Sequence, residues 1–322
     1  MVHVPLDAAV LFGIAALFAA ASGMNDGGAL LATGLKLPSV RPLVGIVTLV
    51  VLVALVPLLS DAVAVTFVTR LASFDRPGGQ AAVLIAVAAA LLVVLVLSAR
   101  GRPTSLTLAL VGGLTGAGLG AGLPVSPGWV LLVLAVGIAS PFAGAATSWL
   151  AARLLVRLAT ARQLRRWHVA GFLLQSAAYA ANDAQKMLAV FMIALGSLAV
   201  PLWLTGLIAA LFGVGALYGM PKAGRTLSRE VIASRPLHGV AAELGAGLTV
   251  VLCAAAGTPV SMTQAIAGGL IGAGIAQSTG RVRWYATVKI VSAWTLTLPV
   301  SLVLAGASAL LVRLVGIVEV WG

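Results

Sequence analysis

The chain has 322 residues, of which 61% are hydrophobic and only 9% are charged. About a quarter of the residues in a soluble domain are charged, so this composition, with a mean hydropathy of +1.12, excludes a soluble protein. The formal net charge of +12 comes from residues in short connections between apolar stretches, which indicates a membrane topology signal rather than nucleic-acid binding. We therefore expect an all-α, polytopic membrane protein.

In chain order, the apolar stretches form two series of five. The first series covers residues 8–35, 43–60, 81–98, 104–122 and 129–152. The second series covers residues 168–195, 202–218, 238–257, 260–278 and 285–312. The sequence thus predicts a first transmembrane repeat over 1–152, an Arg-rich cytoplasmic linker over 153–167 and a second transmembrane repeat over 168–322.

A duplicated motif relates the two series. Residues 103–118 read PTSLTLALVGGLTGAG and residues 259–274 read PVSMTQAIAGGLIGAG, with ten identities in 16 positions at a constant offset of 156. The dipeptide Asn25-Asp26 likewise recurs as Asn182-Asp183, 157 residues later. Matches in one order with nearly constant spacing indicate an internal duplication.

The number of apolar segments predicts that the second repeat is inverted. Each repeat has an odd number of crossings, even if its third and fourth segments form a re-entrant helical hairpin, so the second repeat must start from the opposite face. The first positive residues, Lys36 and Arg41, follow the first apolar span, which favours a retained first helix with its N-terminus outside. Inverted-topology repeats with interrupted helices are typical of secondary transporters, here expected in the plasma (inner) membrane.

The two Asn-Asp pairs are the first candidates for chemistry. Asn25 and Asp26 lie among glycines, and Asn182 and Asp183 lie among small residues, inside otherwise apolar spans. A carboxylate in the hydrocarbon region is costly unless it is paired, so it marks an ion or substrate pathway. Glycines let a helix unwind so that carbonyl groups can join the coordination. We expect these four residues to couple a cation, Na⁺ or H⁺, with Asp26 and Asp183 as metal ligands if the ion is Na⁺.

The duplicated Pro-x-Ser-x-Thr motif supplies candidate anion ligands. Ser105 and Thr107 occupy it in the first repeat, and Ser261 and Thr263 occupy it in the second. Proline ends one helix, and the hydroxyl residues then fall in the first turn of the next. A helix N-terminus offers unpaired N–H groups and a positive dipole end, so two such termini could close on a tetrahedral oxyanion. Ordinary helix capping explains either motif taken singly.

Gln185 and Lys186, which follow the second Asn-Asp pair, complete the candidate phosphate-binding set. Lys186 should lie inside the membrane, where it could pair with Asp26 or Asp183 or help to neutralise a bound anion. The three histidines have no metal-ligand spacing, and neither a Gly-x-Ser-x-Gly elbow nor a phosphate loop accompanies them. An enzyme is therefore not expected, and no cofactor beyond the coupling ion.

These motifs resemble the inorganic phosphate transporter family, the PiT-type phosphate permeases. The family's Gly-Ala-Asn-Asp-Ala-Gln-Lys is similar to residues 180–186, and its Pro-x-Ser-Thr-Thr-His is similar to residues 103–108 and 259–264. Its Trp-x-x-Thr-x-Pro is similar to residues 294–299. The resemblance implies phosphate symport with Na⁺ or H⁺, in which the Asn-Asp pairs couple the cation and the hairpin Ser and Thr residues contact phosphate.

The chain departs from the family pattern at several motif positions. Leu106 and Met262 replace the middle threonines, Leu108 and Gln264 replace the histidines, and Ala29 replaces an asparagine that follows the first Asp by three residues. The two missing hydroxyls leave sulfate or another oxyanion open as the substrate. A passive anion channel and a non-transporting membrane sensor also stay open. The expected partners are inorganic phosphate, the lipid bilayer and, as in many such folds, a second copy in a homodimer, with no nucleic acid.

Overall fold

The computed structural model describes residues 8–35, 37–99, 104–196, 201–225 and 235–315, and most of these residues are helical. Lys36 and Pro103 lie outside these ranges. The elements of the first half are α1 (Ala8–Ser22), η1 (Gly23–Gly27), α2 (Gly28–Gly34), α3 (Pro42–Leu55), η2 (Val56–Leu58), α4 (Ala62–Val65), η3 (Thr66–Arg70), α5 (Gly79–Ala99), α6 (Leu106–Ala121) and α7 (Pro127–Leu158). Those of the second half are α8 (Ala161–Tyr179), η4 (Ala180–Ala184), α9 (Gln185–Leu195), α10 (Leu202–Arg225), α11 (Pro236–Ala255), α12 (Met262–Ile275), η6 (Thr279–Arg281) and α13 (Trp284–Leu314).

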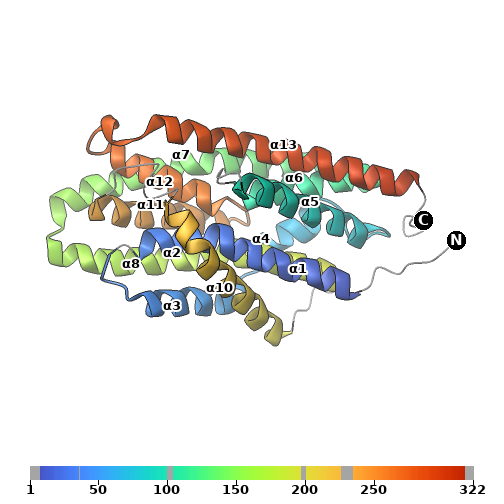
Figure 1. Cartoon of the computed structure of the whole chain (residues 1–322), viewed down its shortest axis with the longest axis horizontal. Coiled ribbons are helices and arrows are strands. Elements are labelled where there is room, and N and C mark those ends of the chain that lie inside the picture. The colour runs from blue at the N-terminus through green and yellow to red at the C-terminus, as the bar shows by residue number, and fades with distance from the viewer. Residues whose placement is uncertain (1–7, 36, 100–103, 197–200, 226–234, 316–322) are drawn as a thin grey trace.

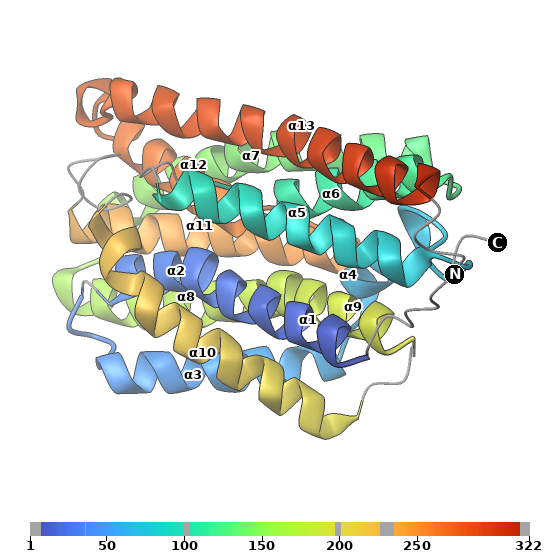
Figure 2. The same cartoon turned by 45° about the vertical axis from the view of Figure 1, so that its right-hand side comes forward.

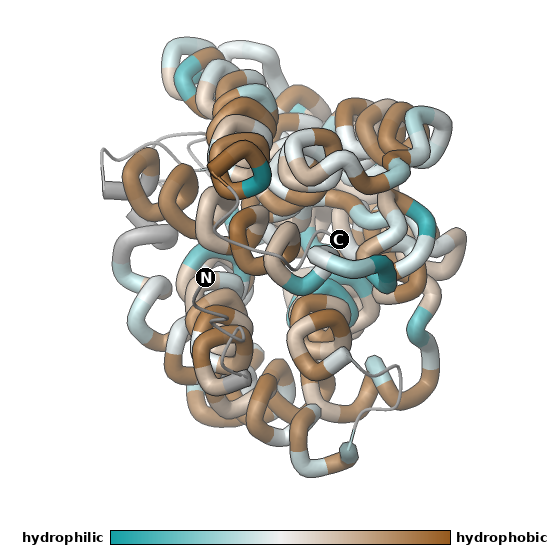
Figure 3. The backbone as a smooth tube through the Cα atoms, turned by 90° about the vertical axis from the view of Figure 1, so that its right-hand side faces the viewer, coloured by the Kyte–Doolittle hydropathy of each residue, from teal (hydrophilic) through white to brown (hydrophobic). Residues whose placement is uncertain are grey.

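The described residues confirm an all-helical, polytopic membrane protein. Within them, six helices are long and apolar enough to cross a membrane, and a bent pair gives a seventh. Figure 3 shows the apolar residues, in brown, distributed along helices throughout the bundle. The six spans are Ala9–Leu31, Gly79–Leu97, Pro127–Leu158, Leu202–Pro221, Pro236–Ala255 and Trp284–Leu314.

Helices α6 and α12 are too short to cross the membrane alone. They have 16 and 14 residues, which at 1.5 Å per residue gives lengths of about 24 and 21 Å, against a hydrocarbon thickness of about 30 Å. Each follows a long helix, α5 or α11, and packs against it. Each half therefore contains a helical hairpin whose second arm begins inside the bundle.

The structure adds detail that the predicted spans lack. The predicted span 43–60 ends early, and a second helical segment follows it at an angle of 65° after a short break. Pro57 lies at this end of the span, where its missing N–H group disfavours continuing the helix. The Arg-rich segment 153–167 is largely helical, because α7 and α8 both extend into it and are separated only by Ala159 and Thr160.

Glycines on the hairpin helices pack the two halves together. A side chain at Gly116 of α6 would overlap the carbonyl oxygen of Leu302 in α13, and one at Gly272 of α12 would overlap the carbonyl oxygen of Ala145 in α7. Each hairpin helix thus packs on the long last helix of the other half, as Figure 1 and Figure 2 show for α6 beside α13. The absence of side chains allows these backbones to approach closely, as is usual between membrane helices.

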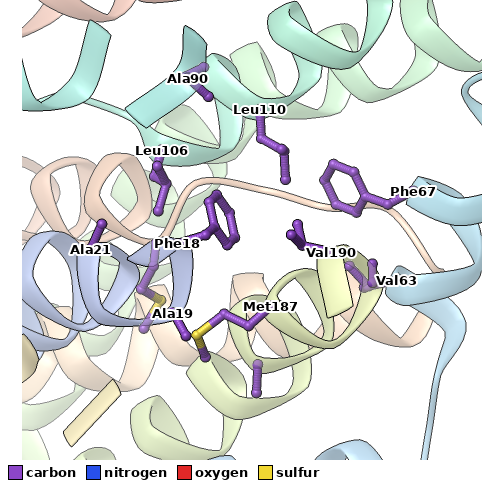
Figure 4. Close-up of a cluster of buried hydrophobic side chains, with 14 of the residues drawn as sticks. Phe18, Ala19, Ala21, Val63, Phe67, Ala90, Leu106, Leu110, Met187 and Val190 are labelled. Atoms are coloured by element: carbon purple, nitrogen blue, oxygen red, sulfur yellow. The ribbon is translucent and has the colours of Figure 1, made fainter. Parts of the chain in front are cut away.

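A cluster of buried apolar side chains lies beneath the first hairpin. Figure 4 shows Phe18 of α1, Phe67 of η3, Leu106 at the start of α6 and Met187 of α9 converging from four elements. All four are 3% exposed or less. This packing fixes the N-terminus of α6 in the interior of the bundle.

The glycine contacts predict a difference between two Gly→Ala substitutions. Gly116→Ala should destabilise the protein by about 1–3 kcal/mol, the usual cost of overpacking, because its methyl group meets the backbone of α13. Gly206→Ala in α10 should be neutral or slightly stabilising, since nothing lies within 4 Å of its added methyl group and alanine favours helix. Thermal unfolding in detergent measures both, and equal melting temperatures would contradict the packing.

Candidate substrate and cation site

Both Asn-Asp pairs lie on widened helical turns. Residues Gly23–Gly27 and Ala180–Ala184 each form a π-helical turn within a continuous helical run. Such turns carry one extra residue, and they occur frequently at functional sites. The glycines and other small residues predict unwound helix at these positions, whereas the structure shows a wider turn with the flanking residues still helical.

In the first half, Asn25 links its neighbouring aspartate to the first hairpin. Its Nδ2 donates to Oδ1 of Asp26 at 3.1 Å and to the carbonyl oxygen of Thr104 at 3.2 Å. Asp26 is only 2% exposed, and Asn25 is partly exposed. Thr104 directly precedes Ser105, so the asparagine positions the carboxylate next to the hairpin tip.

In the second half, Asn182 makes the equivalent links. Its Nδ2 donates to Oδ2 of Asp183 at 3.0 Å and to the carbonyl oxygen of Val260 at 2.7 Å. Its Oδ1 also accepts from the N–H of Val260 at 3.0 Å. Val260 directly precedes Ser261, so both pairs of residues hold a carboxylate at the corresponding point of a hairpin.

The serines of the duplicated motif cap the two hairpin helices. Ser105 Oγ accepts from the N–H of Leu108 at 3.1 Å, and Ser261 Oγ accepts from the N–H of Gln264 at 3.4 Å. Both serines are buried. The helix N-termini, with their positive dipole ends, therefore lie inside the bundle and beside the carboxylates.

The threonines connect the two hairpins to each other. Thr107 Oγ1 donates to the carbonyl oxygen of Val260 at 3.1 Å, and Thr263 Oγ1 donates to the carbonyl oxygen of Thr104 at 3.4 Å. Each hairpin helix therefore donates a hydrogen bond to the residue that precedes the capping serine of the other hairpin helix. The two helix N-termini are therefore close together, and a helix N-terminus is a favourable position for a small anion.

Of the two aspartates that Lys186 could reach, the structure pairs it with Asp183. Its Nζ lies 2.8 Å from Asp183 Oδ1, 2.6 Å from Thr107 Oγ1 and 2.6 Å from the carbonyl oxygen of Val260. The ion pair is buried on both sides. The ammonium group thus joins the second Asn-Asp pair to both hairpins.

Asp26 completes the charged cluster. It accepts a hydrogen bond from Asn25 Nδ2 and lies within the electrostatic influence of Thr263, Asp183 and Lys186. Two carboxylates and one ammonium group therefore share a buried space. Buried charges are tolerated only when partners or bound ions compensate them, so this cluster is suited to a cation as well as an anion.

Gln185 contacts a different element. Its Oε1 accepts from the N–H groups of Val63 at 2.7 Å and Ala64 at 3.2 Å, in the first turn of α4. Those N–H groups have no carbonyl partner within their own helix, because they lie in its first turn. Gln185 therefore caps α4, whereas the other candidate residues lie around the hairpin tips.

Two further polar groups lie at the tips, and the sequence does not predict them as ligands. The Thr104 hydroxyl and the Gln264 amide oxygen are buried without a hydrogen-bond partner among the described residues. The backbone carbonyl groups of Thr104 and Val260 also belong to the site, because they accept hydrogen bonds from its side chains. Every residue type has a backbone carbonyl, so the identities of these two residues do not predict this role. Their place immediately before the duplicated serines is the only indication that the sequence offers for them.

The candidate cation ligands are oxygen atoms. Among the described residues, no group of three or more His, Cys, Asp or Glu side chains could hold a metal ion. In the first half the candidate ligands are the Asp26 carboxylate, the Thr263 hydroxyl and the Thr104 carbonyl, which Asn25 links to Asp26. Such hard ligands suit Na⁺ rather than a transition metal.

The fold and this central charged site define a helical membrane transporter. Residues 159–305 match the Phosphate transporter family. The chain is 27% identical over 318 residues to a probable low-affinity inorganic phosphate transporter of Mycobacterium leprae and 30% identical over 314 residues to one of Mycobacterium bovis, covering 92% of this chain and 75% of each relative. The chain therefore belongs to the phosphate transporter family.

A solved structure supports the fold. The structure titled "The sodium-dependent phosphate transporter" matches this chain with a TM-score of 0.79, covering 96% of this chain and 99% of that one. The two sequences are 18% identical, so this match concerns the fold.

The contacts of Gln185 predict a structural effect of its removal. Gln185→Ala should destabilise the protein by about 1–3 kcal/mol, because two buried N–H groups of α4 lose their acceptor. Gln80→Ala, at an exposed glutamine near the start of α5, serves as the control. Thermal unfolding in detergent measures the difference, and an unchanged melting temperature for Gln185→Ala would show that α4 does not depend on this cap.

Proposed function

We propose that this protein imports inorganic phosphate across the plasma (inner) membrane by symport with a cation, Na⁺ or H⁺. The observation that carries the proposal is the meeting of two helix N-termini next to two buried carboxylates. The relatives named as inorganic phosphate transporters support phosphate as the substrate, and the sodium-dependent structural neighbour supports Na⁺ as the ion.

Phosphate binds between the hairpin tips in this proposal. Ser105 and Thr107 contact it from α6, and Ser261 and Thr263 contact it from α12. Lys186 contributes positive charge through its position beside Thr107. Gln185 acts indirectly by holding α4. The unpaired N–H groups at both helix starts replace the water that the anion loses.

A cation is needed because the site is negatively charged without one. Asp26 and Asp183, when ionised, outnumber the single ammonium group of Lys186 in the cluster. A phosphate anion would enter against this charge, and electrostatic repulsion is strong in a buried site. A cation held by the Asn-Asp pairs, either Na⁺ or a proton on a carboxylate, removes the repulsion. Cation and phosphate binding are therefore coupled.

The two halves work as inverted repeats in an alternating-access cycle. Their reciprocal packing supports this proposal, since α6 packs on α13 as α12 packs on α7. The start of α1 and the end of α13 also lie at the same end of the molecule (Figure 1), and we place this end outside the cell. Movement of the repeats around the buried site would expose it to each side in turn. The homodimer stays a prediction.

The direct test is uptake of radiolabelled phosphate into proteoliposomes of the purified protein. Accumulation above equilibrium under an inward Na⁺ gradient, or under a pH gradient, supports the proposal and identifies the ion. Equilibration without any gradient would indicate a passive anion channel. Uptake of sulfate that phosphate does not inhibit would indicate a transporter of sulfate or a related oxyanion. We expect this result if phosphate binding requires the threonine hydroxyls that Leu106 and Met262 replace.

Asp26→Asn should abolish concentrative phosphate uptake while leaving the fold intact. The amide has nearly the same shape but no charge, so it neither binds a cation as strongly nor releases a proton. Asp75→Asn, at an exposed aspartate, is the matched control. Radiolabelled uptake under the effective ion gradient measures both, and full accumulation by Asp26→Asn would exclude this residue from coupling.

The double substitution Ser105→Ala and Ser261→Ala should raise the phosphate concentration that gives half-maximal uptake. It removes a hydroxyl from each hairpin tip, and each lost hydrogen bond to a charged ligand is worth about 1.5–3 kcal/mol, or roughly tenfold or more in affinity. Each serine also caps a helix, so Thr160→Ala, which removes the side-chain cap of α8 far along the chain, controls for capping. An unchanged half-saturating concentration in the double variant would remove both serines from the site.

A further inference from the structure

The ammonium group of Lys186 is coordinated as a bound monovalent cation would be. Three oxygen atoms lie 2.6–2.8 Å from its Nζ: a carboxylate oxygen of Asp183, the hydroxyl of Thr107 and the carbonyl of Val260. They come from η4, α6 and the connection between α11 and α12, and Lys186 and Asp183 are only 3% and 4% exposed. Carboxylate, hydroxyl and carbonyl oxygens are also the ligands of hard cations.

The first half of the chain has the same oxygen types in the corresponding places. Asp26 corresponds to Asp183, Thr263 to Thr107 and the carbonyl of Thr104 to that of Val260. Thr263 donates to the Thr104 carbonyl at 3.4 Å, as Thr107 donates to the Val260 carbonyl at 3.1 Å. Asn25 also links Asp26 to the Thr104 carbonyl, as Asn182 links Asp183 to the Val260 carbonyl. The two sets are therefore related by the duplication, and each set takes its threonine from the hairpin of the other half.

The two sets differ in one charged residue. At the offset of 157 that relates the Asn-Asp pairs, the residue corresponding to Lys186 is Ala29. Its methyl side chain carries no charge, so the carboxylate of Asp26 has no equivalent ammonium on its own helix. Asp183 is compensated by the protein itself, whereas Asp26 shares only the more distant charge of Lys186.

We propose that Lys186 takes the place of one of two symmetry-related Na⁺ ions, so that only the set formed by Asp26, Thr263 and the Thr104 carbonyl binds an exchangeable Na⁺. The inference rests on the proposed cation-coupled function and adds its stoichiometry: the central pair of sites contributes one Na⁺ per cycle rather than two. In this proposal the ion pair with Lys186 also compensates Asp183 throughout the transport cycle.

Equilibrium binding of ²²Na⁺ to the purified protein in detergent tests the proposal without phosphate. Lys186→Met removes the charge but keeps an unbranched side chain, and it should bind one more Na⁺ per chain than the unaltered protein. Lys289→Met, at an exposed lysine that lies over the ring of Tyr285, should not change the number. An unchanged number for Lys186→Met, or no Na⁺ bound by the unaltered protein, would overturn the proposal.

Two further variants test the same asymmetry if Lys186→Met fails to fold. Asp26→Asn should lose one bound Na⁺, whereas Asp183→Asn should lose none, because its carboxylate is already paired with an ammonium group. Loss of one Na⁺ from each would show two equivalent exchangeable sites and overturn the proposal. A failure of phosphate uptake leaves these counts unaffected, and a symporter that takes up phosphate but binds no Na⁺ overturns this inference alone.

Discussion

Two carboxylates buried among apolar helices impose the main constraint on this protein. Asp26 and Asp183 are 2% and 4% exposed, in a chain with only eight acidic residues. Neither charge is tolerable there without compensation. Each aspartate therefore has an asparagine beside it that binds the carboxylate and a hairpin carbonyl, and Asp183 also has an ammonium group. The same demand for compensation is the physical basis of the bound cation that we propose.

The surrounding architecture holds the helix N-termini at these carboxylates. Short helices that begin inside the bundle would leave backbone N–H groups unsatisfied in the membrane. Serine caps satisfy one N–H group at the start of each hairpin helix, and the nearby carboxylates favour the positive ends of both helices. Close glycine contacts fix the depth of both hairpin helices against α7 and α13. Because each hairpin packs on the other half, a movement between the halves also moves the hairpin tips relative to the Asn-Asp pairs. This links substrate binding to the transport motion that we propose.

The sequence predicts those features that depend on the type of side chain and on its spacing along the chain. The apolar spans, the Asn-Asp pairs and the serine caps of the hairpins are of this kind. The bent segment α4–η3 could not be predicted, because α4 has four residues and its first turn is capped by Gln185, more than 100 residues away. The choice of Asp183 over Asp26 as the partner of Lys186 also depends on three-dimensional packing. The role of the Thr104 and Val260 carbonyl groups as hydrogen-bond acceptors depends on this packing as well.

The proposed mechanism requires that a phosphate ion binds between the N-termini of α6 and α12. An experimental structure of the protein in a bilayer mimic, with saturating phosphate and Na⁺, would locate the bound phosphate directly. We expect a tetrahedral anion between the two hairpin tips, with its oxygens within about 3.2 Å of the hydroxyl or N–H groups of both first turns. A phosphate ion bound elsewhere, or held by one hairpin alone, would contradict the mechanism.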